Sequence, residues 1–257
     1  MIYLCVNFFT MGSLLYIGVD DTDNNESRGT GFLARSLAQV LQEEGLCLVG
    51  TVSRHQLLVD PRIQYTSHNS SACIVGEIKG NEYRIQDVCS DFILKHAAAD
   101  SDAGLCITLE ENLTRAVAGF GQRAKQEVLE SCEAYMVALK RRIFLAGLTG
   151  DKTGIIGALA AVGLRYHGND GRLLWLPGLR EIQGLFTVRK YQDLVPVDDI
   201  VDMDGNTLDP ETIIRITDWC RPVIRNKKIV LFAEKSEGNE HSGYQSASKE
   251  YIKRISE

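Results

Sequence analysis

Three aspartates follow an apolar run near the start of the chain, in the stretch VDDTDN. Asp20, Asp21 and Asp23 come directly after residues 14–18 (LLYIG), and no basic residue lies beside them. Carboxylates this close repel one another unless a cation compensates them, and Mg²⁺ prefers oxygen ligands. The spacing therefore predicts a metal site with these three aspartates as ligands, and it makes Asp20 and Asp21 candidate catalytic residues.

A threonine between two glycines follows at the predicted start of a helix. Gly29, Thr30 and Gly31 lead into FLARSLAQVLQEEG, where apolar residues recur at helical spacing. Backbone N–H groups at a helix N-terminus favour an anion. Carboxylates beside such an N-terminus suit Mg²⁺ that bridges to a phosphate, so we expect a nucleotide here. The alternative is a plain turn in which Asp and Asn cap the helix.

Two better-known motifs fit this chain less well. An EF-hand loop starting at Asp21 would place Glu26 where glycine is needed and Phe32 where the bidentate glutamate belongs. A P-loop needs Gly-Lys-Ser/Thr, whereas in GLTGDKTG Asp151 separates the glycine from the lysine. The acidic cluster therefore fits an EF-hand poorly, and GLTGDKTG fits a P-loop poorly.

Other polar residues are candidates for contacts with ligands. His68 and Asn69 lie in a polar loop between predicted strands and are expected to contact substrate, with a simple turn as the alternative. Asp102 is either a substrate ligand or a cap. Lys152 and Thr153 precede a predicted helix, where a phosphate contact competes with an ordinary solvated loop.

The elements that must position these residues follow from hydrophobic periodicity. A strand over 14–19, a helix to Gly45 and a strand over 46–55 form a β-α-β unit, which predicts an at least partly parallel sheet. Arg54, at the end of that second strand, is either a phosphoryl-stabilising residue or a surface arginine. Further expected elements are strands over 70–78 and 104–109, and helices over 83–99, 122–145 and from Gly154.

The predicted secondary structure changes beyond residue 170, where short strands alternate with turns. We therefore predict an α/β domain that binds ATP and Mg²⁺ over residues 12–165 and a smaller α+β domain over 166–257. Residues 1–10 are expected to be an N-terminal extension, with Met11 as the natural start.

Composition limits the partners. The net charge of −6 and the pI of about 5.5 favour a small molecule or a protein over a nucleic acid. Seven dispersed cysteines without a CxxC pair predict a reducing, cytoplasmic location. The apolar N-terminal segment ends at the aspartates, so no membrane association is expected. The oligomeric state is not indicated.

Four stretches, in the same order along the chain, resemble motifs of the archaeal tRNA(Ile2) 2-agmatinylcytidine synthetases. GVDDTD with RGTGFLA resembles the family's G-I/V-D-D-T-D and R-G-M-C-T-T-Y-L-A. The other matching stretches are DPRIQYTSHNSSA (60–72), SDAGL (101–105) and GIIGALAAVGL (154–164). The resemblance implies a kinase-like ATP-binding domain with a ferredoxin-like domain. It also implies that Asp20, Asp21 and Asp23 bind Mg²⁺-ATP and that Thr30 is the autophosphorylated threonine.

The chain also departs from this family. Gly29 replaces the family's cysteine, the basic residues of its K-T-R-G-N-G segment are missing at 66–70, and the OB-fold and zinc ribbon that grip tRNA have no counterpart. Family members use ATP and agmatine to modify a wobble cytidine. The departures lead us to expect tRNA to be a doubtful partner and the acceptor to be a small molecule, such as an amine.

Three functions therefore compete. The first is a Mg²⁺-ATP-dependent transferase or ligase that activates or phosphorylates an acceptor, with His68, Asn69 and Asp102 on the acceptor side. The second is a regulatory protein that binds a nucleotide or metabolite without turnover. The third is tRNA cytidine modification in which a separate partner chain binds the RNA.

Overall fold

A computed structural model describes residues 12–63, 65, 68–236 and 243–257, so the predicted extension over residues 1–10 lies outside the described part. The first half contains strands β1 (Leu14–Asp20), β2 (Cys47–Gln56), β3 (Ser70–Ile78), β4 (Gly104–Leu109) and β5 (Phe144–Gly147). Its helices are α1 (Thr30–Glu43), α2 (Glu82–His96), α3 (Arg115–Arg123), α4 (Ser131–Arg141) and α5 (Ile155–His167), with a 3-10 turn at Glu110–Asn112.

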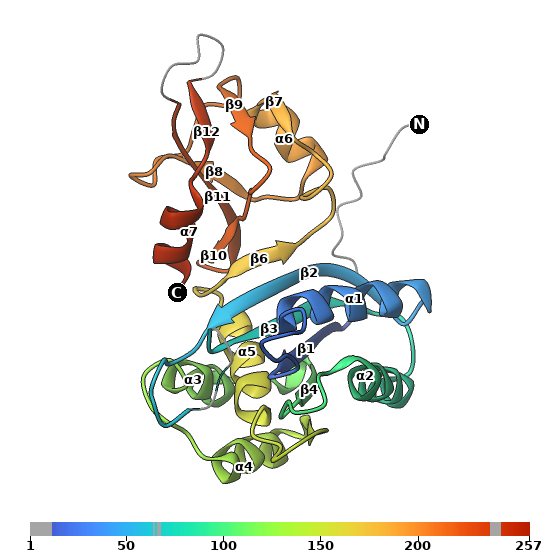
Figure 1. The fold of residues 1–257 in the computed structure, drawn as a ribbon. Coiled ribbons are helices and arrows are strands. Elements are labelled where there is room, and N and C mark those ends of the chain that lie inside the picture. Colours follow the sequence, from blue (N-terminus) through green and yellow to red (C-terminus); the bar gives the residue numbers. More distant parts are fainter. Residues whose placement is uncertain (1–11, 64, 66–67, 237–242) are drawn as a thin grey trace.

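The second half contains strands β6 (Arg172–Trp175), β7 (Gly184–Thr187), β8 (Asp199–Val201), β9 (Ile213–Ile216), β10 (Val223–Arg225), β11 (Lys228–Lys235) and β12 (Tyr244–Ser246), and helices α6 (Val188–Leu194) and α7 (Lys249–Ser256). Figure 1 shows this half above the first, with β2 and β6 running between them.

The strands form one mixed sheet of twelve, in the order β5-β4-β1-β3-β2-β6-β10-β11-β12-β9-β7, with β8 paired to β11. In the first half every pair is antiparallel, because β3 inserts between β1 and β2. The β-α-β unit predicted at β1, α1 and β2 therefore contributes no parallel pair, because β3 separates its two strands. The parallel pairs occur only in the second half of the described chain, at β8–β11 and β9–β12.

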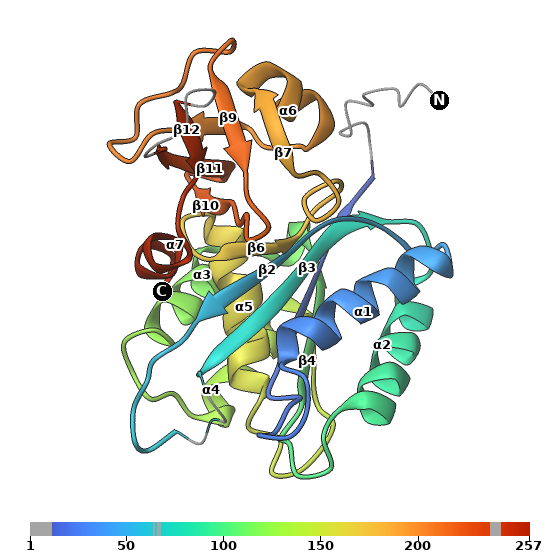
Figure 2. The same cartoon turned by 45° about the horizontal axis from the view of Figure 1, so that its top comes forward.

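Helices cover both faces of the first-half sheet (Figure 2). Leu15, Ile17 and Val19 of β1 face a core shared with α1 and α2, whereas Tyr16 faces a core shared with α3 and α5. Side chains of a strand alternate between the two faces, so a strand covered on both sides reads as a continuous apolar run. This double cover holds the end of β1, with its aspartates, in a fixed position.

The single helix expected over 122–145 is wrong. Helix α3 ends at Arg123, a turn follows, and α4 begins at Ser131. A capping box stops the pattern from continuing, because the side chains of Glu130 and Glu133 each accept from the other's backbone N–H. The turn between the two helices reaches the site described below.

The sheet continues from one half to the other through β6, which pairs with β2 and with β10. The domain division predicted at residues 165 and 166 falls in the last turn of α5. A third and a fourth core, around β7–β12, α6 and α7, belong to the second half. Of the helices that the structure describes, none is both long and apolar enough to span a bilayer.

Candidate functional site

Antiparallel pairing collects the predicted site residues at one edge of the sheet. Asp20 is the last residue of β1 and lies opposite Gly104, the first residue of β4. Asp102 precedes β4, and His68 and Asn69 precede β3, the other neighbour of β1. Residues far apart in the sequence therefore meet where β1 ends and its two neighbours begin.

A cavity of about 320 Å³ lies at this edge. Its lining includes eight of the predicted site residues: Asp20, Asp21, Asp23, Thr30, His68, Asn69, Asp102 and Thr153. Apolar side chains complete the wall: Leu57, Val128, Leu129 and Ile156. A second hollow of about 460 Å³ adjoins it and is also acidic, with Glu26 and Asp100 among its lining residues. The arrangement suits a ligand that carries or brings positive charge.

The carboxylates at the end of β1 are poorly compensated. Asp20 is only 9% exposed, and burial together with the charge of Asp21 raises its pKa well above its ordinary value. Burial and the charges of Asp102 and Asp23 raise the pKa of Asp21 to about 6. Removing negative charge, or adding a cation, therefore stabilises this edge.

The side chain of Asp20 lies against a helix of the opposite core. A Cβ at Gly157 of α5 would lie 1.8 Å from Asp20 Oδ2, so only glycine leaves room for the carboxylate. In the described ranges, no three His, Cys, Asp or Glu side chains are already gathered as a metal-binding set. The three predicted ligands are thus near one another without forming a closed cage.

A hydrogen-bonded threonine pair links Asp23 to helix α1. Asp23 Oδ1 accepts from the Thr30 backbone N–H at 3.2 Å and from its hydroxyl at 2.7 Å. The Thr30 hydroxyl in turn accepts from the backbone N–H and the hydroxyl of Thr22, at 3.2 and 3.1 Å. Asp23 therefore caps α1, and Thr22, the third residue of DDTD, is a site residue that the sequence pattern did not single out.

Asp102 organises the loop before α5. Its Oδ1 accepts from the Asp151 backbone N–H at 2.5 Å, and its Oδ2 accepts from the Thr153 hydroxyl at 3.1 Å. Lys152 lies between these two residues but does not line the acidic cavity. The structure thus groups Thr153 with the site and leaves the predicted phosphate contact of Lys152 without geometric support.

Gly29 and Gly31 line a different hollow, of about 290 Å³, on the other side of Thr30. Three arginines also line it: Arg35, Arg54 and Arg180. Of these, only Arg54 was a candidate from the sequence. A Cβ at Gly31 would lie 2.6 Å from Leu174 Cδ1, so this glycine lets α1 approach β6. Asp23, Thr30 and His68 line both hollows, which makes the acidic and basic regions adjacent.

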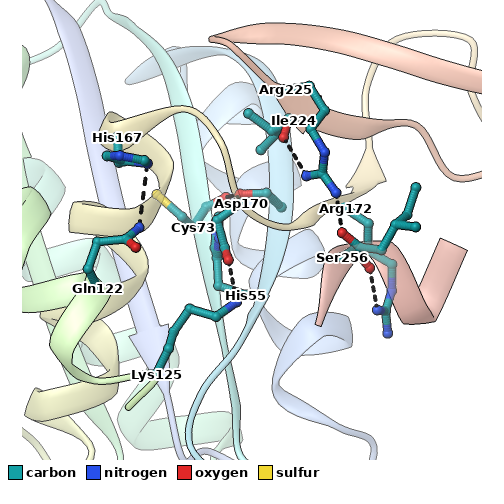
Figure 3. A network of polar contacts seen from close by, with 12 residues as sticks. His55, Cys73, Gln122, Lys125, His167, Asp170, Arg172, Ile224, Arg225 and Ser256 are labelled. Atoms are coloured by element: carbon teal, nitrogen blue, oxygen red, sulfur yellow. Dashed lines mark hydrogen bonds and ion pairs between the residues drawn. The ribbon is translucent and has the colours of Figure 1, made fainter. Parts of the chain in front are cut away.

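A second ionisable group of residues is buried between the halves. His55 is fully buried, with Nδ1 2.9 Å from Asp170 Oδ1 and Nε2 2.8 Å from the Ser53 hydroxyl. Lys125 pairs with the other oxygen of Asp170, as Figure 3 shows. A neutral His55 fits, because it donates to Asp170 and accepts from Ser53. Two residues with no periodic signal in the sequence, Lys125 and Asp170, complete this network.

No protein-family model matches the chain. The tRNA(Ile2) 2-agmatinylcytidine synthetase TiaS of Archaeoglobus fulgidus is 28% identical over 214 residues, which cover 82% of this chain and 48% of TiaS. The chain is homologous to TiaS. An uncharacterised protein of Methanocaldococcus jannaschii is 28% identical over 59% of this chain and 50% of its own length. The chain thus spans about half the length of these curated relatives.

Solved structures of TiaS share the fold. A TiaS–tRNA(Ile2)–ATP complex matches with a TM-score of 0.53 and 28% identity, over 59% of this chain and 36% of that one. A complex with tRNA(Ile2), AMPCPP and agmatine matches with a TM-score of 0.55 over 95% of this chain and 55% of that one. At 22% identity it shows the fold alone. The mixed α/β architecture is therefore that of TiaS.

The expectation that tRNA is a doubtful partner is wrong, because the homologous structures include TiaS bound to tRNA(Ile2). The expectation rested on the departures from the family, which include the missing basic residues at 66–70, and on the net charge of −6, which averages over the whole chain. An acidic total is compatible with a local basic surface, and the arginines beside α1 form one.

Proposed function

We propose that this protein is an ATP-using ligase of the TiaS type that modifies a tRNA. The observation that carries the proposal is the gathering of four carboxylates, Asp20, Asp21, Asp23 and Asp102, around one cavity beside the start of α1, where burial and neighbouring charge raise the pKa values of Asp20 and Asp21. Homology to TiaS, which has been solved with ATP and tRNA(Ile2), supports it. Four carboxylates are a poor environment for a nucleotide alone, so a divalent cation must accompany it.

The donor set fits Mg²⁺. The ion usually takes one or two protein carboxylates and completes its shell with water and phosphate oxygens, so an open cluster suits it better than a closed cage. Asp20, Asp21 and Asp23 would hold it. A bound Mg²⁺ would supply charge neutralisation for the phosphates of ATP.

Thr30 would act as the phosphoacceptor. Its hydroxyl donates to Asp23 at 2.7 Å, so the carboxylate could take the proton as the Thr30 oxygen attacks the γ-phosphorus of ATP and ADP leaves with the electrons of the broken P–O bond. The two bonds that Thr30 accepts from Thr22 hold the hydroxyl in one orientation. His68 and Asn69 would contact the acceptor, since both line the same cavity from the start of β3.

The topology supports the finer fold assignment that we propose for the first half. Its element order is β-α-β-β-α-β through β4, and the sheet order is β4-β1-β3-β2. This is the split β-α-β arrangement of ferredoxin-like folds. We propose that the kinase-like nucleotide site is built on this sheet edge, with α3, α4 and α5 closing the other face.

Intact-protein mass spectrometry after incubation with Mg²⁺ and ATP tests the phosphoacceptor. We expect a metal-dependent gain of one phosphoryl group that is absent from Thr30→Ala and retained in Thr30→Ser. The matched control is Thr212→Ala, a threonine of the second half. Phosphorylation that persists in Thr30→Ala would remove Thr30 from the mechanism.

ATP consumption in the presence and absence of unmodified tRNA transcript tests the reaction. We expect tRNA to stimulate consumption when an amine such as agmatine is supplied, and the tRNA mass to increase by the condensed amine. Binding of ATP that leaves it intact under all these conditions would contradict the proposal and favour a binding protein without turnover.

A further inference from the structure

Arginines from both halves of the chain gather beside the start of α1. Arg28 and Arg35 flank the ring of Phe32, with their guanidinium carbons 4.2 and 5.5 Å from its centroid. Arg180, from the loop after β6, donates its Nε–H to the Leu174 backbone carbonyl at 3.0 Å. Leu174 is the residue that packs on Gly31 of α1, so Arg180 is held against this helix.

A further guanidinium extends the group, which we call the arginine cluster: Arg28, Arg35, Arg180 and Arg221. Arg221 stacks on Trp219, with its guanidinium carbon 5.4 Å from the ring centroid. Burial and the charges of Arg180 and Arg35 lower the pKa of Arg221 to about 10. Burial and the charges of Arg180 and Arg28 lower the pKa of Arg35 as well. The guanidiniums therefore repel one another.

Carboxylates do not compensate this charge. Within the described ranges, none of the four guanidinium groups lies within 4.0 Å of a carboxylate oxygen. Some other surface arginines are paired: Arg62, Arg84, Arg123 and Arg189 each contact Asp or Glu. In a chain with 34 acidic and 28 basic residues, an uncompensated group of this kind indicates an anionic ligand.

The cluster also presents aromatic surface. Phe32 is 38% exposed, and the guanidinium groups of Arg28 and Arg35 lie over its ring. Arginine forks bind phosphate oxygens in pairs, and guanidinium planes stack with unpaired bases. Alternating arginines and aromatic rings are therefore suited to a single-stranded nucleic acid, which offers both groups, better than to a free inorganic anion.

The cluster leads into the candidate active site. The hollow of about 290 Å³ is lined by Phe32, Arg35 and Arg180 together with Asp23, Thr30 and His68. The last three residues also line the acidic cavity. A strand held by the arginines would thus direct one nucleotide toward the carboxylates.

We propose that the arginine cluster, with Phe32 as the support on which the guanidinium groups of Arg28 and Arg35 lie, binds the phosphates and one base of a single-stranded RNA segment beside the nucleotide to be modified. The proposal rests on the proposed function for the identity of the strand as RNA. It assigns the strand to a surface formed jointly by α1 and the second half of the chain.

Fluorescence anisotropy with a short labelled single-stranded RNA of mixed sequence tests this, in EDTA so that the carboxylates cannot recruit anions through a metal. Each phosphate contact contributes about 0.7 to the slope of log affinity against log salt for single strands. We expect the double variant Arg35→Gln, Arg180→Gln to lower that slope by about 1.4 between about 50 and 200 mM NaCl. The control Lys140→Gln, Arg141→Gln removes the same two charges from exposed positions of α4, on the opposite face of the sheet, and should change neither slope nor affinity.

Phe32→Leu keeps an apolar side chain and removes the ring, so it should weaken RNA binding at least about fivefold without changing the salt slope. Thermal melts establish that each variant is folded. Unchanged affinity and slope in the arginine variant would overturn the proposal. So would a loss confined to binding of ATP in EDTA, because the cluster would then hold nucleotide phosphates.

Failure of the proposed function is separable. Asp21→Asn should stop ATP consumption and leave RNA binding in EDTA intact. If wild-type protein consumes no ATP but its RNA binding depends on the arginines and Phe32, the ligase proposal fails and the binding surface stands. If ATP is consumed but the arginine variant binds RNA normally, the reverse holds.

Discussion

Two groups of carboxylates in this protein have the same residue type and opposite electrostatics. At the end of β1, Asp20 and Asp21 have raised pKa values because burial and neighbouring aspartates both disfavour their charge. Between the halves, Asp170 has a lowered pKa, because contacts with His55 and Lys125 outweigh its burial. Asp20 and Asp21 face an open cavity and have acidic neighbours, whereas Asp170 is paired with His55 and Lys125 inside the protein.

This difference in pKa and accessibility distinguishes a binding site, the acidic cavity, from a structural network, the contacts of Asp170. The Asp170 network joins β2 to the turn before β6, and His55 leaves no space for a side chain at Gly171, where a Cβ would lie 2.7 Å from Nδ1. Its hydrogen bonds end within the protein. The carboxylates of the acidic cavity instead require a positively charged ligand from solution to compensate them. An excess of negative charge therefore indicates a binding site only where the carboxylates can be reached from solvent.

The largest effect is expected from breaking the satisfied group. Asp170→Ala leaves Lys125 without its carboxylate and His55 without its acceptor inside the protein, which should lower the free energy of unfolding by about 3–5 kcal/mol. Urea unfolding measures this. The exposed Asp218→Ala is the control and should change little. If Asp170→Ala lowers the free energy of unfolding by less than about 1 kcal/mol, the Asp170 network does not stabilise the contact between the halves.

The acidic edge should respond in the opposite way. Asp21→Asn removes a charge that its neighbours repel, so stability should stay constant or rise, whereas ATP consumption should fall about a hundredfold. Thermal melts and turnover assays on the same preparation check both. A variant that is active, or that is inactive because it is less stable, would contradict the assignment of Asp21 to the site.

Acid should weaken the network through His55. Burial lowers the pKa of His55 in the folded protein below its ordinary value of 6.5, so the unfolded chain takes up a proton that the folded chain refuses. Stability should therefore be full above about pH 6.5 and fall below it by up to about 1.4 kcal/mol per pH unit. Urea midpoints across pH 5–8 measure this. His55→Gln should flatten the profile in this range, and an unchanged profile would exclude His55.

The smallest effects come from a matched pair of helical glycines. A Cβ at Gly119 of α3 meets nothing within 4 Å, so Gly119→Ala should raise stability by about 0.5–1 kcal/mol and leave activity unchanged. Gly157→Ala should instead displace Asp20, whose Oδ2 lies 1.8 Å from the new atom, and lower ATP consumption about tenfold. Equal activity in the two variants would show that the position of Asp20 is unimportant.

Local pattern predicted much of the first half. The apolar run of β1 and the periodicity of α1 and α2 correspond to elements at Leu14–Asp20, Thr30–Glu43 and Glu82–His96. The long helix expected over 122–145 failed, since periodicity continued across a break that a capping box makes. Helical periodicity reports which residues face the core, and it is insensitive to a turn that keeps the same face inward.

The chemical types of the site residues can be read from the local sequence, because three aspartates before a glycine-flanked threonine favour a cation with an anion beside it. Which residues lie next to these aspartates depends on the fold. Strand order placed Asp102 and Asn69 at the end of β1, and the pairing of β2 with β6 brought Arg180 to α1. Strand pairing depends on contacts between residues far apart in the chain, which no local pattern of charge or hydrophobicity encodes.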